Sequence, residues 1–141
     1  LRLLEIKKGF LKEREILFAE YNGKSDAFEF SKNYSVLIED TIRIILADKK
    51  FNFALASAGS FSRRELSPYS DIDLMIISES IEKDDTDIKE VITSLWDGGI
   101  EASHTVRELS DIKKYLSTDL HTFTQFFETR FINGDVLLYN K

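Results

Sequence analysis

Two aspartates separated by one residue are the feature of this sequence whose type and spacing suit chemistry. Asp71 and Asp73 stand at the start of an apolar run, residues 72–77, which predicts a buried strand. Side chains two apart on a strand point to the same face, so the two carboxylates should converge. Neighbouring carboxylates repel, and a divalent cation with a preference for hard oxygen ligands relieves that repulsion. The pair therefore predicts a Mg²⁺ or Mn²⁺ site suited to in-line displacement at phosphorus.

A glycine–serine turn precedes the aspartates. Gly59 and Ser60 follow a short apolar segment, residues 53–58, which we interpret as a buried strand although its alanines also suit a helix. Glycine lets the backbone approach a ligand closely, and exposed N–H groups can form a concavity for phosphate. Arg63 and Arg64 follow, and one of them could hold a triphosphate through paired donors. Each of these features is weak alone, and their co-occurrence favours a nucleotide site.

The first third of the chain predicts the helices that support this site. Apolar residues recur at helical spacing from Leu3 to Phe18, which predicts an amphipathic helix ending near Asn22 and Gly23. Asp26 could cap a second helix that ends before Lys49. Together they predict a helical hairpin over residues 1–50.

The middle of the chain predicts the sheet. Besides the strands at 53–58 and 72–77, we expect a third strand at 100–107 and a helix at 88–96 that ends at a glycine pair. Between these elements we expect one helical turn at 63–66 and an acidic loop at 80–87.

The last third predicts two short helices. Ser110 could cap the first and Asp119 the second, with Phe131 facing inward and residues 133–134 as the stop. The order of elements predicts an α+β fold, a small mixed β-sheet with flanking helices. We expect one domain over 1–141, made of the hairpin (1–50), the catalytic sheet core (51–108) and C-terminal helices (109–141).

Composition excludes several function classes. The 141 residues contain no cysteine and two histidines, which excludes disulfides, zinc–thiolate sites and cysteine nucleophiles and leaves too few histidines for a multi-histidine centre. The net charge of −6, without a basic stripe, argues against nucleic acid as a partner. No apolar run approaches the roughly 20 residues of a membrane helix, so no membrane partner is expected. We expect a cytoplasmic protein, and the first residue, Leu1, suggests a piece of a longer one.

Two blocks of the sequence carry a family resemblance. Residues 58–74 resemble the signature of the DNA polymerase β-like nucleotidyltransferase superfamily. Within this block, the arginine–glutamate–leucine step at 64–66 and the serine before the aspartates resemble the catalytic domain of the PII-protein uridylyltransferase group. Residues 95–107 are similar to that group's stretch after the first helix of the catalytic core. The resemblance covers nearly the whole chain.

The resemblance implies a reaction and a set of site residues. It implies Mg²⁺- or Mn²⁺-dependent transfer of UMP from UTP to a tyrosine hydroxyl of a PII-type nitrogen-signalling protein, with release of pyrophosphate. Asp71 and Asp73 match two metal-binding carboxylates, and Glu101 is the candidate for a third on the neighbouring strand. The residues expected to bind the nucleotide are Gly59, Ser60, Arg63, Arg64 and Ser70.

The sequence also departs from the group. Glycines are usual in the group where this chain has Ser60, Ser62 and Arg64. Ser62 and Arg64 leave open a catalytically inert nucleotide-binding regulatory module. A second alternative is a related nucleotidyltransferase with a different acceptor, next to sensory domains. The hydrolase and regulatory domains of full uridylyltransferases do not fit within this chain, so uridylyl removal is not assigned to it.

Overall fold

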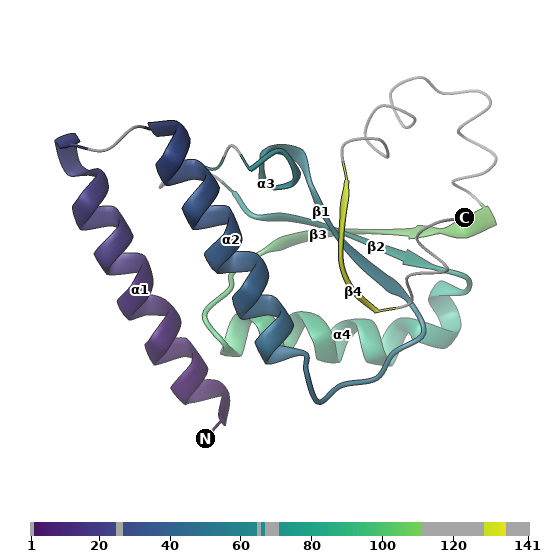
Figure 1. The fold of residues 1–141 in the computed structure, drawn as a ribbon. Helices are drawn as coiled ribbons and strands as arrows, with labels where there is room; N and C mark the ends of the chain where they lie inside the picture. Colours follow the sequence, from purple (N-terminus) through teal and green to yellow (C-terminus); the bar gives the residue numbers. More distant parts are fainter. Residues whose placement is uncertain (1, 25–26, 65, 67–70, 111–128, 135–141) are drawn as a thin grey trace.

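The computed structural model describes residues 2–24, 27–64, 66, 71–110 and 129–134. It confirms the predicted α+β fold, in which helices pack on a small mixed sheet (Figure 1). The sheet has four strands in the order β3-β2-β1-β4. No helix in these ranges is long and apolar enough to cross a membrane.

The N-terminal hairpin is formed by α1 (Arg2–Lys24) and α2 (Ala27–Ile45). Helix α2 lies between α1 and the strands (Figure 1). Apolar side chains at helical spacing bury one face of α2, among them Phe30, Ile38 and Ile42. Phe18 of α1 packs against Phe30 with ring centroids 5.6 Å apart. The hairpin is therefore held by the same apolar stripe that predicted it.

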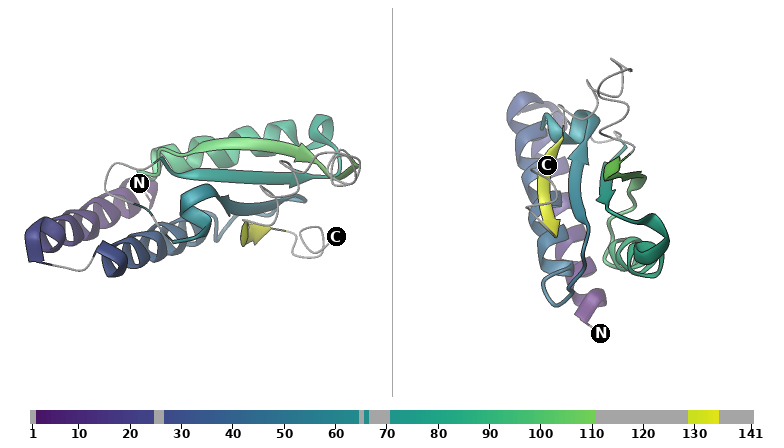
Figure 2. Two further views of the ribbon diagram at one scale, coloured as in Figure 1. Left: turned by 90° about the horizontal axis from the view of Figure 1, so that it is seen from above. Right: turned by 90° about the vertical axis from the view of Figure 1, so that its right-hand side faces the viewer.

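The sheet is built around β1 (Ala54–Ala58). This strand pairs antiparallel with β2 (Asp73–Ser78) on one side and with β4 (Arg130–Gly134) on the other. On the far side of β2, β3 (Ser103–Glu108) runs parallel. A parallel neighbour requires a crossover, and α4 (Ile81–Asp97) provides it, running alongside β2 and β3 (Figure 2).

The main core lies between the sheet and the helices. Leu74 and Ile76 of β2 belong to the same buried cluster as residues of α1, α2 and α4. The alternate residues Met75 and Ile77 belong to a second, smaller cluster on the opposite face. Asp73 shares the parity of Met75, so its side chain belongs to the face opposite the main core.

Three sequence predictions are corrected here. Residues 80–87 are not an acidic loop, because Ser80 caps α4 by accepting from the Lys83 N–H at 3.4 Å. Acidic residues are favourable in the first turn of a helix, at the positive end of its dipole. In the sequence alone, the same density of charges was typical of a loop. The helical turn lies at Gly59–Ser62 rather than at 63–66. Residues 130–134 form strand β4 rather than the end of a helix, because pairing satisfies the second edge of β1.

Candidate active site

The antiparallel pairing of β1 and β2 places Gly59 beside Asp73. Ala58 is the partner of Asp73 in the register, and Gly59 follows it directly. Gly59 has a φ of +57°, and a Cβ at this position would lie 3.1 Å from Asp73 Oδ2. Glycine adopts this backbone conformation readily and leaves room for the carboxylate. The turn backbone and the second aspartate thus lie close together, while their assignment to one nucleotide site stays a prediction.

The two aspartates influence each other electrostatically. Partial burial raises the pKa of Asp73 above its ordinary value of 3.8, and the negative charge of Asp71 raises it further. Asp71 itself is exposed. Neither carboxylate forms an ion pair within the part of the chain that the structure describes.

The parallel pairing of β2 and β3 sets the position of Glu101. Ser103 is the register partner of Asp73, and its N–H donates to the Ile72 carbonyl at 2.9 Å. Counting back two residues on each strand brings Glu101 level with Asp71. Its side chain is exposed, and the described residues contain no group of three acidic or histidine side chains that could hold a metal. The role of Glu101 as a third ligand stays a prediction.

The short helix α3 (Gly59–Ser62) shapes the turn. Phe61 is fully buried and anchors the turn in the main core. The Ser62 hydroxyl donates to the Gly59 carbonyl at 2.7 Å, so this side chain is used within the turn. Ser60 is half-buried and Arg63 is exposed. Their predicted nucleotide contacts stay predictions, as does that of Ser70, which lies outside the described residues.

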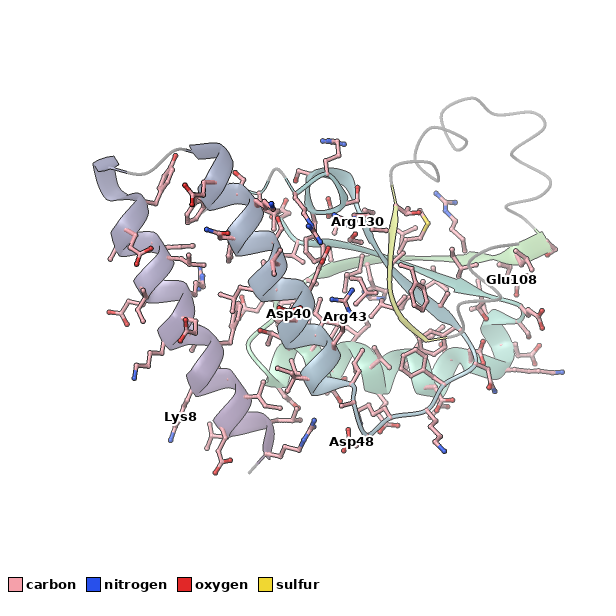
Figure 3. The ribbon with its side chains drawn as sticks, viewed as in Figure 1. Lys8, Asp40, Arg43, Asp48, Glu108 and Arg130 are labelled. Atoms are coloured by element: carbon pink, nitrogen blue, oxygen red, sulfur yellow. The ribbon has the colours of Figure 1, made fainter. Side chains whose placement is uncertain are left out.

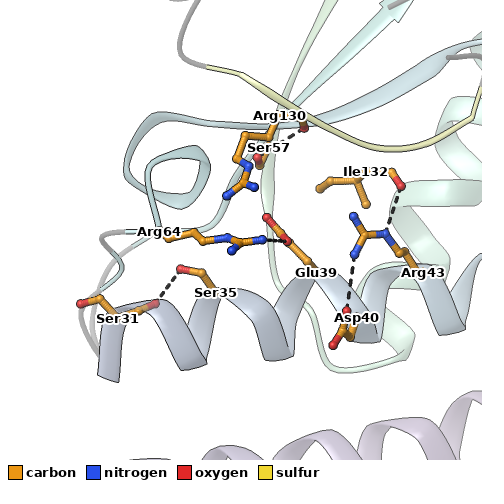
Figure 4. A network of polar contacts seen from close by, with 9 residues as sticks. All are labelled: Ser31, Ser35, Glu39, Asp40, Arg43, Ser57, Arg64, Arg130 and Ile132. Carbon is orange, nitrogen blue, oxygen red and sulfur yellow. Dashed lines mark hydrogen bonds and ion pairs between the residues drawn. The ribbon is translucent and has the colours of Figure 1, made fainter. Parts of the chain in front are cut away.

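The Arg64 side chain contacts helix α2. The φ of Arg64 is 57°, in the left-handed region that favours glycine, so an arginine at this position is under backbone strain. Its guanidinium Nη2 lies 3.2 Å from Glu39 Oε2 on α2 (Figure 4). Arg43 of the same helix (Figure 3) donates from Nε to the Ile132 carbonyl at 3.3 Å, a contact that joins α2 to β4 (Figure 4). Polar contacts therefore join the hairpin to both the turn and the sheet edge.

Glu39 is the residue that the sequence analysis missed. It stands on the buried stripe of α2 beside Ile38, at a position where the helical period calls for an apolar residue. An acid on such a stripe is rarely buried without a partner. That mismatch was the available signal, although it could not name Arg64 as the partner.

Fold and site together define the class of protein. It is an α+β domain in which Asp73, with Asp71 as its electrostatic neighbour, lies beside a glycine turn where the two central strands of a mixed sheet meet. No family profile matches the chain.

Similarity to known proteins is extensive along this chain but covers little of theirs. The bifunctional uridylyltransferase/uridylyl-removing enzyme of Ectopseudomonas mendocina is 31% identical over 136 residues, which is 91% of this chain and 15% of that protein. The enzyme of the same name from Aliivibrio fischeri is 31% identical over 89% of this chain and 16% of its own length. That of Hydrogenovibrio crunogenus is 40% identical over 88 residues, 62% of this chain and 10% of its own. The chain is thus related, over most of its length, to one region of these uridylyltransferases, and it spans about a tenth to a sixth of their length.

Proposed function

We propose that this chain is the catalytic region of a metal-dependent nucleotidyltransferase. In this proposal it transfers UMP from UTP to a hydroxyl group, with a tyrosine of a PII-type signalling protein as the acceptor, and pyrophosphate leaves. Support comes from relatives that are named uridylyltransferases and are similar over most of this chain. The observation that carries the proposal is the contact of Asp73 with the Gly59 turn, next to a second carboxylate without an ion pair within the described ranges.

The residues divide into two tasks. Asp71 and Asp73, with Glu101 as the third candidate, would hold Mg²⁺ or Mn²⁺, which supplies charge neutralisation and activates the attacking hydroxyl. The Gly59–Ser60 backbone would hold phosphate oxygens next to the metal, and its closeness to Asp73, whose Oδ2 would lie 3.1 Å from a Cβ at Gly59, supports this role. The acceptor hydroxyl would lose its proton to solvent as its oxygen forms a bond to the α-phosphorus and the bond to the bridging oxygen of pyrophosphate breaks. Catalysis then comes from positioning and charge rather than from a protein nucleophile.

Calorimetric titration tests nucleotide and metal binding. UTP with Mg²⁺ or Mn²⁺ should bind the intact protein, and Asp71→Asn or Asp73→Asn should remove the metal-dependent heat. Glu13→Gln, an exposed acid on α1, is the matched control and should bind as the unaltered protein does. No heat in the unaltered protein, or full heat in both aspartate variants, would refute the proposal.

The acceptor needs its own measurement. Label from α-labelled UTP should appear on a purified PII-type protein and disappear when its acceptor tyrosine is changed to phenylalanine. Nucleotide binding without this labelling would favour the related transferase with another acceptor. Nucleotide binding with no transfer to any acceptor would favour the inert module.

The structure bears on the inert alternative. Its two hints were Ser62 and Arg64, which replace glycines usual in the related group. Ser62 donates to the Gly59 carbonyl, and Arg64 pairs with Glu39. Both side chains are thus used for contacts inside the protein, which supports a turn that keeps its approach to phosphate open.

A further inference from the structure

We propose that Glu39 is a positioning residue, which holds Arg64 and through it fixes the turn at 59–64 against Asp73. This inference rests on the proposed function, because it concerns how that turn is kept ready for phosphate. It assigns the N-terminal hairpin a part in the site, since α2 carries Glu39. Glu39 would touch neither substrate nor metal and would act only through Arg64.

The burial of the pair is the first observation. The Glu39 side chain is 4% exposed and that of Arg64 is 30% exposed, at a separation of 3.2 Å. Glu39 Oε1 and Arg64 Nε are also buried, and neither has a hydrogen-bond partner among the described residues. A buried pair with unused polar atoms contributes little net stability compared with apolar side chains. Stability alone is therefore a poor reason for an acid and a base at these two positions.

The backbone of Arg64 is the second observation. A φ of 57° is unfavourable for a side chain with a Cβ, by about 1 kcal/mol. Such a conformation persists where the surroundings fix it. The Arg64 N–H donates to the Phe61 carbonyl at 3.1 Å, and its side chain is held by Glu39. The ion pair thus holds the strained end of the turn in place, through a contact that a glycine at this position could not make.

The path from the pair to the site is short. The turn begins at Gly59, close to Asp73, and its Phe61 side chain is buried in the main core. At the end of the turn, Arg64 pairs with Glu39. From β4, the Arg130 side chain extends toward the same pair, and its carbonyl accepts from the Ser57 hydroxyl at 3.4 Å (Figure 4). Loss of the anchor at Arg64 should therefore loosen the backbone that faces Asp73, without touching the carboxylates themselves.

The experiment compares Glu39→Gln, Arg64→Gly and the double variant in the intact protein. Asp40→Asn is the matched control, because Asp40 is the next residue on α2 and also pairs with an arginine, Arg43, but is exposed. Three kinds of measurement are made: the thermal midpoint of unfolding, amide hydrogen exchange of residues 59–64, and transfer kinetics that give KM and kcat for UTP. We expect Glu39→Gln to speed exchange in the turn and to raise KM for UTP by about tenfold with a smaller change in kcat.

The double variant separates positioning from stability. Arg64→Gly alone strands a buried carboxylate and should lower the midpoint. Adding Glu39→Gln removes that charge, while the glycine relieves the backbone, so the midpoint should recover. If positioning is the role, fast exchange and a raised KM persist in the recovered double variant. If exchange and KM return to the original values together with the midpoint, the pair is merely structural and the proposal is overturned.

The outcome is distinguishable from failure of the proposed function. Absence of UTP binding in the unaltered protein refutes the transferase assignment but leaves the exchange measurement valid. Unchanged exchange at 59–64 in Glu39→Gln then refutes the positioning role by itself. An effect of Asp40→Asn as large as that of Glu39→Gln would also refute it, since any acid on α2 would then serve.

Discussion

Glu39 and Asp73 are two partly or fully buried carboxylates on opposite sides of one turn, and they are treated differently. Glu39 is almost inaccessible and faces an arginine at 3.2 Å. Asp73 is half-buried and has a second acid, Asp71, as its electrostatic neighbour. The same functional group is thus neutralised within the protein on one side of the turn, and left with excess negative charge on the other.

The difference teaches how to separate a structural acid from a binding acid. A buried acid that contributes only to the fold needs an internal partner, because an uncompensated charge is costly. An acid that binds a cation remains without a counter-charge until the cation binds. A raised pKa, such as that of Asp73, is a sign of such an uncompensated charge. Glu39 fits the first description, and the second is the role that we propose for Asp73. The following changes should break or sharpen this contrast.

The largest effect is expected for Asp73→Asn. Removing a metal-binding carboxylate should lower nucleotide transfer by about 10³-fold or more, because the charge that balances the cation is lost. The metal-free variant should be as stable as the original protein or slightly more stable, since a destabilised charge has been removed. Transfer assays and thermal denaturation in a chelator measure the two quantities. A less stable, fully active variant would contradict the assignment.

Arg64→Met should lower the stability of the protein, in contrast to Asp73→Asn. The methionine keeps an apolar stem but leaves Glu39 buried without its ion-pair partner. We expect a loss of about 2–3 kcal/mol in the free energy of unfolding, below the range for a fully buried pair because Arg64 is partly exposed to solvent. Urea denaturation measures this, with Asp71→Asn as the comparison that should cost nothing. Equal stability of the two variants would remove the distinction between the two acids.

Glu101→Gln tests whether a third acid belongs to the proposed metal site. If Glu101, two residues before β3, completes the metal site, transfer should fall by about 10- to 100-fold with a higher metal requirement. Glu13→Gln on α1 is again the control. An activity within twofold of the original would restrict the metal site to the two aspartates.

Gly59→Ala tests the contact between the turn and Asp73. The new Cβ would meet Asp73 Oδ2 at 3.1 Å and force a left-handed φ on alanine, which costs about 1–2 kcal/mol. We expect a lower midpoint and weaker UTP binding. Gly9→Ala is the control, because no atom lies within 4 Å of a Cβ at that position on α1. The idea fails if both alanines behave alike.

The smallest effect is a pH dependence. Because the pKa of Asp73 is raised in the folded protein, protonation competes with Mg²⁺ at a higher pH than for an ordinary aspartate. Metal affinity should fall as the pH drops through that raised pKa. The stability of the metal-free protein should change in the opposite direction. The ionised Asp73 destabilises the fold above its raised pKa, and this destabilisation disappears as the pH falls towards 3.8. Comparing the original protein with Asp73→Asn over this pH range isolates the group.

Local pattern was enough for much of this molecule. The apolar stripe of α2, the short runs that became β1 and β2, and the helical spacing of Ile88, Val91 and Leu95 in α4 all predicted their elements. These succeeded because periodicity is set within one element and is visible without its neighbours.

Contacts distant in sequence were decided only by the tertiary structure. The strand β4, whose Phe131 had been assigned to a helix, depends on an open edge of β1 more than 70 residues earlier. The partner of Glu39 is 25 residues away along the chain, and the match of Gly59 to Asp73 depends on strand register. The sequence by itself determined which residue types are present and how they repeat along each element. Which charge is cancelled and which is left for a ligand depends on distances between elements, and only folding sets those.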